Sequence, residues 1–202
     1  MRFFRPRLVV LGCGNPSRGD DAVGPALLER VNRWIKAHPD KSVAAVEDFQ
    51  LQVEHILDLE DRDLALFVDA AASGPDPYTL TRIAPQADSS FTTHAISPQA
   101  VLHAFRALGN GDAPPSFVLG VRGHSFELGE GLSPEALHNL ESAWVLIEHL
   151  LEKPSLECWE RCCTQPRFCD CTVPLASGFG LQASGSHHQK YEPMRSDSWP
   201  EA

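Results

Sequence analysis

The chain has 202 residues, 43% of them hydrophobic, and a formal net charge of −10 at pH 7, which allows one domain with a sizeable core or a smaller domain followed by a tail. The negative charge disfavours nonspecific binding to nucleic acid, which needs clustered Lys and Arg, and no apolar run approaches the roughly 20 residues of a membrane span. Because the apolar part of the amino-terminal segment MRFFRPRLVV is also too short for a secretory signal, we expect a cytoplasmic protein with neither a nucleic-acid nor a membrane partner.

The first predicted elements are a strand, a turn with two glycines and a helix. The strand is predicted over residues 7–13, where the apolar run Leu8–Leu11 leads into Gly12-Cys13-Gly14-Asn15. Apolar residues at a spacing of about 3.6 then predict a helix over residues 21–37. Asp20 or Asp21 is placed to cap the first turn of this helix.

Strands and helices then alternate along the chain. Further strands are predicted over residues 42–49, 63–71, 78–83 and 116–121, and helices over residues 52–59, 98–108 and 134–152. Ser97-Pro98 and Ser133-Pro134 open the last two helices, with Ser as the cap and Pro in the first turn. The alternation predicts an α/β domain with a mostly parallel sheet.

The two glycines of the first turn also raise the question of a nucleotide site, because strand–turn–helix units of this kind bind phosphates. The dinucleotide-binding fingerprint needs a third glycine where this chain has Ser17. The carboxylates of Asp20 and Asp21 would also repel a phosphate at the start of the helix. An acid pair at the open end of a strand suits a cation better.

Charged and polar residues follow the ends of two further predicted strands. Asp69 ends a strongly apolar run, and His94 lies in a polar link ahead of the 98–108 helix. Ligands of open α/β sheets sit at the carboxyl ends of the strands, so Asp21, Asp69 and His94 can converge there as ligands of nickel, zinc or iron. Each has a purely structural alternative: an acid favoured by the helix dipole, a turn cap and a surface histidine.

The composition changes after residue 153. Residues 154–202 are rich in Ser, Pro, Gly and Cys, and we predict a poorly ordered tail behind a domain of residues 1–153. The tail holds five of the six cysteines: Cys158, Cys162, Cys163, Cys169 and Cys171. These cysteines, with His187 and His188, are an alternative zinc module, but no pair has the Cys-x-x-Cys spacing of a metal finger.

Three motifs resemble those of the nickel–iron hydrogenase maturation endopeptidases. The first covers residues 11–15 (LGCGN) and 19–25 (GDDAVGP), and the second is Val68-Asp69-Ala70 at the end of a central strand. The third is Thr93-His94 shortly before a helix that starts with proline. The resemblance extends over residues 7–153.

The resemblance implies a fold, an activity and a set of site residues. The family has a three-layer α/β fold, a twisted, mostly parallel five-stranded sheet with helices on both faces. Its members remove a C-terminal extension from the precursor of the hydrogenase large subunit after nickel insertion. Asp21, Asp69 and His94 would bind that nickel, which belongs to the precursor, and are the candidate catalytic residues. Whether the metal is catalytic or only a recognition handle stays open.

One segment differs from many members of this family. Asp48-Phe49-Gln50 stands where relatives carry an Asp-Gly-Gly-Thr-like stretch, and it resembles the subgroup that processes bidirectional, NAD-reducing hydrogenases. The resemblance implies a role in recognising the substrate, and the alternative is a strand end followed by a helix cap from Asp48. Cys13, flanked by glycines, is interpreted as a small packed residue rather than a nucleophile.

Two other functions stay open. One is a nickel-binding hydrogenase assembly protein without peptidase activity, which would share the fold and the ligands. The other is a nucleotide-using α/β enzyme built on Gly12 and Gly14, which would be stabilised by ATP or NAD.

Overall fold

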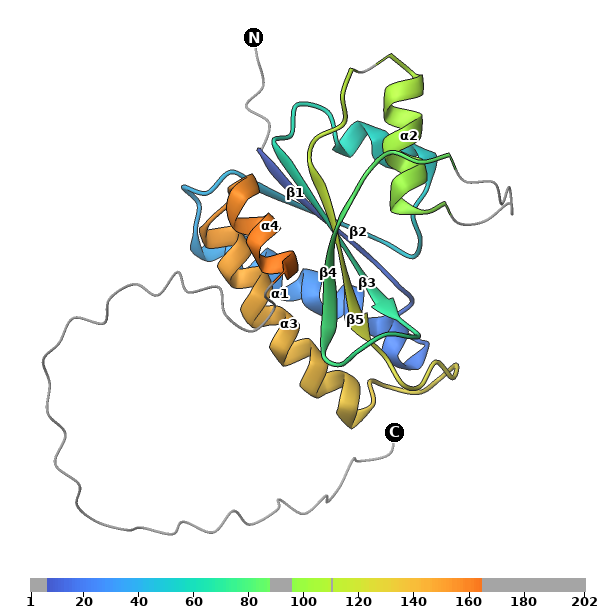
Figure 1. The fold of residues 1–202 in the computed structure, drawn as a ribbon. Coiled ribbons are helices and arrows are strands. Elements are labelled where there is room, and N and C mark those ends of the chain that lie inside the picture. Colours follow the sequence, from blue (N-terminus) through green and yellow to red (C-terminus); the bar gives the residue numbers. More distant parts are fainter. Residues whose placement is uncertain (1–6, 88–95, 110, 165–202) are drawn as a thin grey trace, which may run out of the picture. The chain divides into compact units, whose positions relative to one another are not determined.

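A computed structural model describes residues 7–87, 96–109 and 111–164. These residues form a five-stranded sheet in the order β2-β1-β3-β5-β4 (Figure 1). The strands are β1 (Leu8–Cys13), β2 (Val43–Asp48), β3 (Leu64–Ala71), β4 (Tyr78–Ile83) and β5 (Ser116–Arg122). All neighbouring pairs are parallel except β4 with β5, which is antiparallel and leaves β4 at one edge. The predicted mostly parallel five-stranded sheet is confirmed.

Helices cover both faces of this sheet. They are α1 (Val23–Ala37), α2 (Pro98–Ala107), α3 (Pro134–Glu152) and α4 (Leu156–Thr164), with 3-10 helices η1 (Gly19–Ala22) and η2 (Val53–Asp58). Helices α1, α3 and α4 lie on one side of the sheet and α2 with η2 on the other (Figure 1). The arrangement has three layers, as predicted.

The alternation of side chains along the central strands builds a core on each face. Leu11 of β1 and Phe67 of β3 point toward the α2 side, where they pack in one buried cluster with Ile56 and Leu102. On the opposite side Gly12 lies against α1, and a Cβ atom on it would stand 1.9 Å from Leu28 Cδ2. The glycine therefore lets α1 approach the end of β1 closely.

The helix starts show which capping predictions hold. Ser97 Oγ accepts a hydrogen bond from Ala100 N at 3.2 Å, and Ser133 Oγ accepts one from Ala136 N at 3.1 Å, so both serine caps are confirmed. The predicted cap of the first helix is wrong, because no side chain caps α1. Residues 19–22 instead form the separate 3-10 turn η1, which leaves the two acids free to face elsewhere.

The chain continues beyond α3 into the helix α4, which contacts β4. Trp159 of α4 has no exposed surface; its Nε1 donates to Leu150 O at 3.2 Å, and its ring meets Phe117 edge-on at a centroid distance of 5.2 Å. The prediction of an irregular tail from residue 154 is wrong for this helix, because Cys158, Trp159 and Cys162 form its buried face. Residues 165–202 lie outside the described part.

Among the described residues, no helix has both the length and the apolar composition that a membrane span requires.

Candidate functional site

Acidic side chains gather where the parallel strands β1, β2 and β3 end. In the sheet register Cys13 pairs with Asp48, and Gly12 pairs with Val68, the residue before Asp69. Parallel strands end at the same edge of a sheet, so Asp48 and Asp69 flank the end of β1 on its two sides.

The glycine turn brings a further acid to this edge. Asp21 Oδ2 accepts a hydrogen bond from Asn15 N at 2.9 Å. The turn is close-packed: Gly14 has a φ of +144°, and a Cβ atom on it would lie 2.0 Å from Asp21 O. The residue must be glycine for both reasons. The Asp21 carboxylate thus occupies the Asn15 amide, which a bound phosphate would otherwise use, and this supports the argument against a nucleotide site.

The neighbouring acid Asp20 has a different environment. It has no exposed surface and accepts hydrogen bonds from His124 N, Ser125 N and Ser133 N at 2.6–2.8 Å, and from Ser133 Oγ at 2.8 Å. Burial acts to raise the pKa of Asp20, but these hydrogen bonds together outweigh it and hold the pKa below its ordinary value. Asp20 therefore anchors the loop before α3 to η1, whereas Asp21 faces the strand ends.

The acids at the strand ends influence one another. Asp69 is exposed toward solvent, yet desolvation by the protein around it raises its pKa to about 6, and the nearby charge of Asp21 adds to the rise. The hydrogen bond from Ala70 N, at 2.7 Å, acts in the opposite direction. Such a group is poised to lose its proton when a cation arrives.

Cys13 lies within this ring of acids. Burial first, and then the charges of Asp69, Asp48 and Asp21, raise the pKa of the Cys13 thiol to about 12. The thiol is therefore protonated at neutral pH and is no nucleophile. The interpretation of Cys13 as a packed residue is in agreement with its place in the α2-side core.

An apolar cavity of about 310 Å³ adjoins the acids. It opens between the sheet and α2, and Cys13 and Asp69 line it together with Leu51, Phe67 and Pro98. A mostly apolar cavity with a carboxylate at its border suits an apolar side chain beside a polar reacting group.

The predicted recognition segment continues the same edge. Phe49 is 65% exposed, and its amide donates to Asp48 Oδ1 at 2.6 Å. Asp48 is not a helix cap, since Gln52 holds the cap position of η2. Gln50 is partly buried.

A histidine that sequence reasoning missed lies beside Asp48. His55 of η2 is 6% exposed, its Nε2 is 3.5 Å from Asp48 Oδ2, and its Nδ1 accepts from Gln52 N at 2.9 Å. The one sequence signal for His55 was its position on the short helix predicted directly after the acidic segment. The structure brings Asp21, Asp48 and Asp69 together, while the predicted ligand His94 lies outside the described residues.

Comparisons with known proteins define the fold further. No family model matches the chain, and no curated protein matches it. Among solved structures, the NiFe hydrogenase maturation protease HycI from Thermococcus kodakarensis is similar, with 22% identity and a TM-score of 0.56 over 74% of this chain and 94% of that one. The hydrogenase maturating endopeptidase HybD from E. coli has 24% identity and a TM-score of 0.56 over the same shares. At these identities the likeness establishes a shared fold.

Proposed function

We propose that this chain is an endopeptidase that removes the C-terminal extension of a nickel–iron hydrogenase large-subunit precursor after nickel insertion. The observation that carries the proposal is the proximity of Asp21 in η1 to Asp69 near the carboxyl end of β3, where the charge of Asp21 helps to raise the pKa of Asp69. The fold shared with proteins described as hydrogenase maturation proteases supports it.

Clustered carboxylates without a cation repel one another, and a divalent ion removes that repulsion. The nickel of the precursor would supply the ion, so the substrate and not the protein brings the metal. Asp21 and Asp69 would hold it through oxygen, and His94 would add an imidazole nitrogen, a donor that suits nickel. A precursor without nickel would lack this attraction, which makes cleavage depend on completed metal insertion.

The cavity beside Asp69 offers a place for the chain to be cut. An apolar side chain of the precursor near the scissile bond fits its lining, which would fix the bond next to the acids. Since the Cys13 thiol stays protonated, the attacking group would be water. Nickel at this point can polarise the scissile carbonyl or activate that water.

We further propose that Asp48, Phe49 and Gln50 recognise the precursor, of the class belonging to bidirectional NAD-reducing hydrogenases. Exposed aromatic side chains contribute strongly when they are buried in an interface, and Phe49 is the large apolar side chain of this segment. The direct bond from its amide to Asp48 holds the segment against the strand end.

The test is the intact mass of a nickel-loaded precursor after incubation with the protein. Asp21→Asn and Asp69→Asn are expected to abolish the loss of the C-terminal peptide, because each removes a ligand charge. Asp40→Asn, in the exposed link between α1 and β2, is the matched control and is expected to cleave normally.

Three results would count against the proposal. Cleavage of nickel-free precursor at the full rate would show that the reaction does not depend on nickel. Binding of the loaded precursor without any change of mass would instead establish an assembly protein without peptidase activity. A rise in melting temperature with ATP or NAD would favour the nucleotide-using enzyme.

A further inference from the structure

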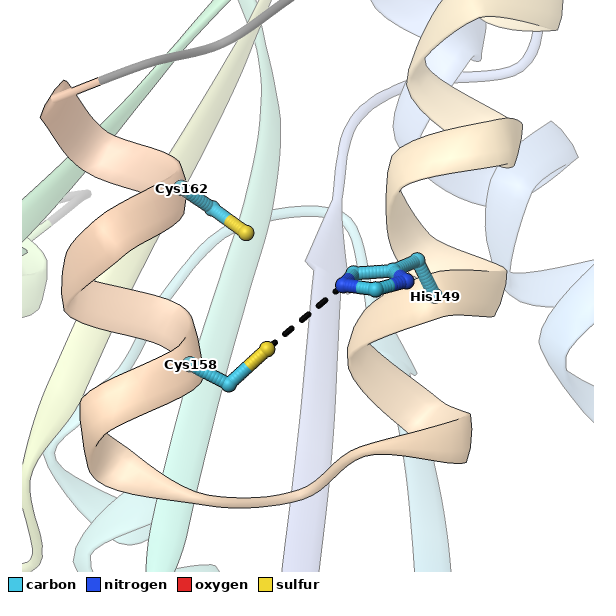
Figure 2. Close-up of side chains that lie close together, drawn as sticks. All are labelled: His149, Cys158 and Cys162. Carbon is cyan, nitrogen blue, oxygen red and sulfur yellow. Dashed lines mark hydrogen bonds between the residues drawn. The ribbon is translucent and has the colours of Figure 1, made fainter. Parts of the chain in front are cut away.

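A second group of possible metal ligands lies on helices α3 and α4, and it uses no residue of the candidate functional site. His149 belongs to the last turn of α3, while Cys158 and Cys162 are one turn apart on α4. Figure 2 shows the three side chains pointing toward one another across the gap between the helices. Cys158 Sγ is 3.5 Å from His149 Nε2, and the ligand atoms of all three lie within 4.8 Å of one another.

The chemical state of the three side chains suits a metal. Cys158 and Cys162 are each 2% exposed and neither is in a disulfide. The Nε2 atom of His149 faces the sulfur of Cys158, and an imidazole nitrogen together with thiolates is a ligand set typical of zinc.

We propose that His149, Cys158 and Cys162 form a zinc site that ties α4 to α3. In a tetrahedral site with Zn–S near 2.3 Å and Zn–N near 2.0–2.1 Å, ligand atoms stand about 3.5–3.8 Å apart. The pair of Cys158 and His149 already has this separation. The 4.8 Å limit leaves the two sulfur atoms at most about 1.0 Å, and the His149–Cys162 pair at most about 1.3 Å, too far apart, which side-chain rotations close.

Charge distinguishes zinc from other ions. Two thiolates and a neutral imidazole compensate Zn²⁺ fully, whereas a monovalent copper ion would leave a net negative charge among buried groups. Calcium and magnesium prefer oxygen ligands, which the cluster does not offer.

The sequence contains this site only in part. The sequence shows the cysteines after residue 154 as possible metal ligands, but the third ligand, His149, belongs to helix α3 before them. Three protein ligands leave a fourth tetrahedral position for water or a further donor. An ion bound here would add its binding free energy to the docking of α4, because the unfolded chain does not preform the site.

The experiment uses the full chain, reduced and freed of metal, titrated with zinc against a chromophoric chelator. His149→Gln and Cys162→Ser are expected to weaken zinc binding by more than the roughly 10- to 100-fold loss caused by removal of an outer-shell partner. The matched control is Cys163→Ser on the same helix, where Sγ donates to Trp159 O at 3.4 Å and lies outside the cluster. This control is expected to bind zinc as the unchanged chain does.

Three further measurements distinguish loss of the metal site from loss of the fold. Thermal melting of the unchanged chain and of Cys163→Ser should shift upward with zinc, and melting of the two ligand variants should not. Far-ultraviolet circular dichroism without metal checks that each variant folds. Cobalt(II) in place of zinc should give a thiolate charge-transfer band that Cys162→Ser diminishes and Cys163→Ser preserves.

The possible contrary results are distinct. No zinc binding by the reduced full chain would overturn the proposal. Equal binding by the unchanged chain, His149→Gln and Cys162→Ser would also overturn it, because the ion would then be held by other side chains. Loss of binding in Cys163→Ser as large as that in the ligand variants would show that the cluster is not the site.

Discussion

Replacing either of two adjacent acids is expected to have different effects, because only one of them supports the fold. The Asp20 carboxylate accepts hydrogen bonds from three backbone amides and one hydroxyl group. In Asp20→Asn, one of the two acceptor oxygens is replaced by an amide group that can only donate. A hydrogen bond to a charged group contributes about 1.5–3 kcal/mol, and a buried donor without a partner costs about 1–3 kcal/mol. With part of the network retained, we expect a loss of roughly 3 kcal/mol in unfolding free energy.

Asp21→Asn is the matched comparison. Among the described residues, Asp21 accepts one amide hydrogen bond, from Asn15, so its replacement should cost about 1 kcal/mol or less. For a domain of this size the melting temperature should fall by roughly 6–12 °C with Asp20→Asn and by no more than about 4 °C with Asp21→Asn.

Thermal melting followed by circular dichroism measures both changes. The pH dependence gives an independent check, because hydrogen bonding holds the pKa of Asp20 below its ordinary value. Its stabilisation is present above the unfolded-state pKa of about 3.9 and is lost as the pH falls through the folded-state value. The difference between unchanged chain and Asp20→Asn should therefore narrow below about pH 4. Equal melting temperatures for the two variants at pH 7 would refute the division of roles.

Three further changes test other parts of the structure. Trp159→Ala should destabilise the protein by about 3–5 kcal/mol, measured by urea unfolding, because a large fully buried side chain is removed; an effect below about 1 kcal/mol would mean that α4 is not docked. Cys13→Ala should leave precursor cleavage within about threefold of the unchanged protein in the mass assay, since the protonated thiol takes no part; complete loss in a folded variant would make it a catalytic group. Asp69→Asn should raise the melting temperature at pH 7, because desolvation penalises the charged carboxylate, and the gain should shrink as the pH falls from about 6 toward 4; an unchanged gain across that range would contradict the raised pKa.

The elements of the fold were predictable because their signals are local. The apolar run before Asp69 and the Ser-Pro pairs at Ser97 and Ser133 each identify an element from a few neighbouring residues. Helix α4 was missed because its buried face consists of two cysteines and one tryptophan, in a stretch whose composition suggested a tail. Cysteine packs as a small apolar residue, a property that a count of possible metal ligands overlooks.

The site was only partly predictable, for a different reason. The gathering of Asp21 and Asp69 followed from the rule that parallel strands end at one edge. The different environments of Asp20 and Asp21 could not be predicted in this way, because the hydrogen-bond partners of Asp20 lie more than a hundred positions away in the sequence. His55 was missed for a similar reason, since its proximity to Asp48 depends on how η2 returns toward the sheet.

The anchoring of Asp20 also bears on how the protein is made. The glycine turn lies near the amino terminus and is synthesised early. The amides that hold η1 in place belong to residues 124–133, which leave the ribosome much later. A nascent chain that stops short of Ser133 therefore carries the acid pair without the contacts that orient it. Long-range contacts of this kind slow folding. The acid pair therefore reaches its final orientation only after most of the domain has been translated.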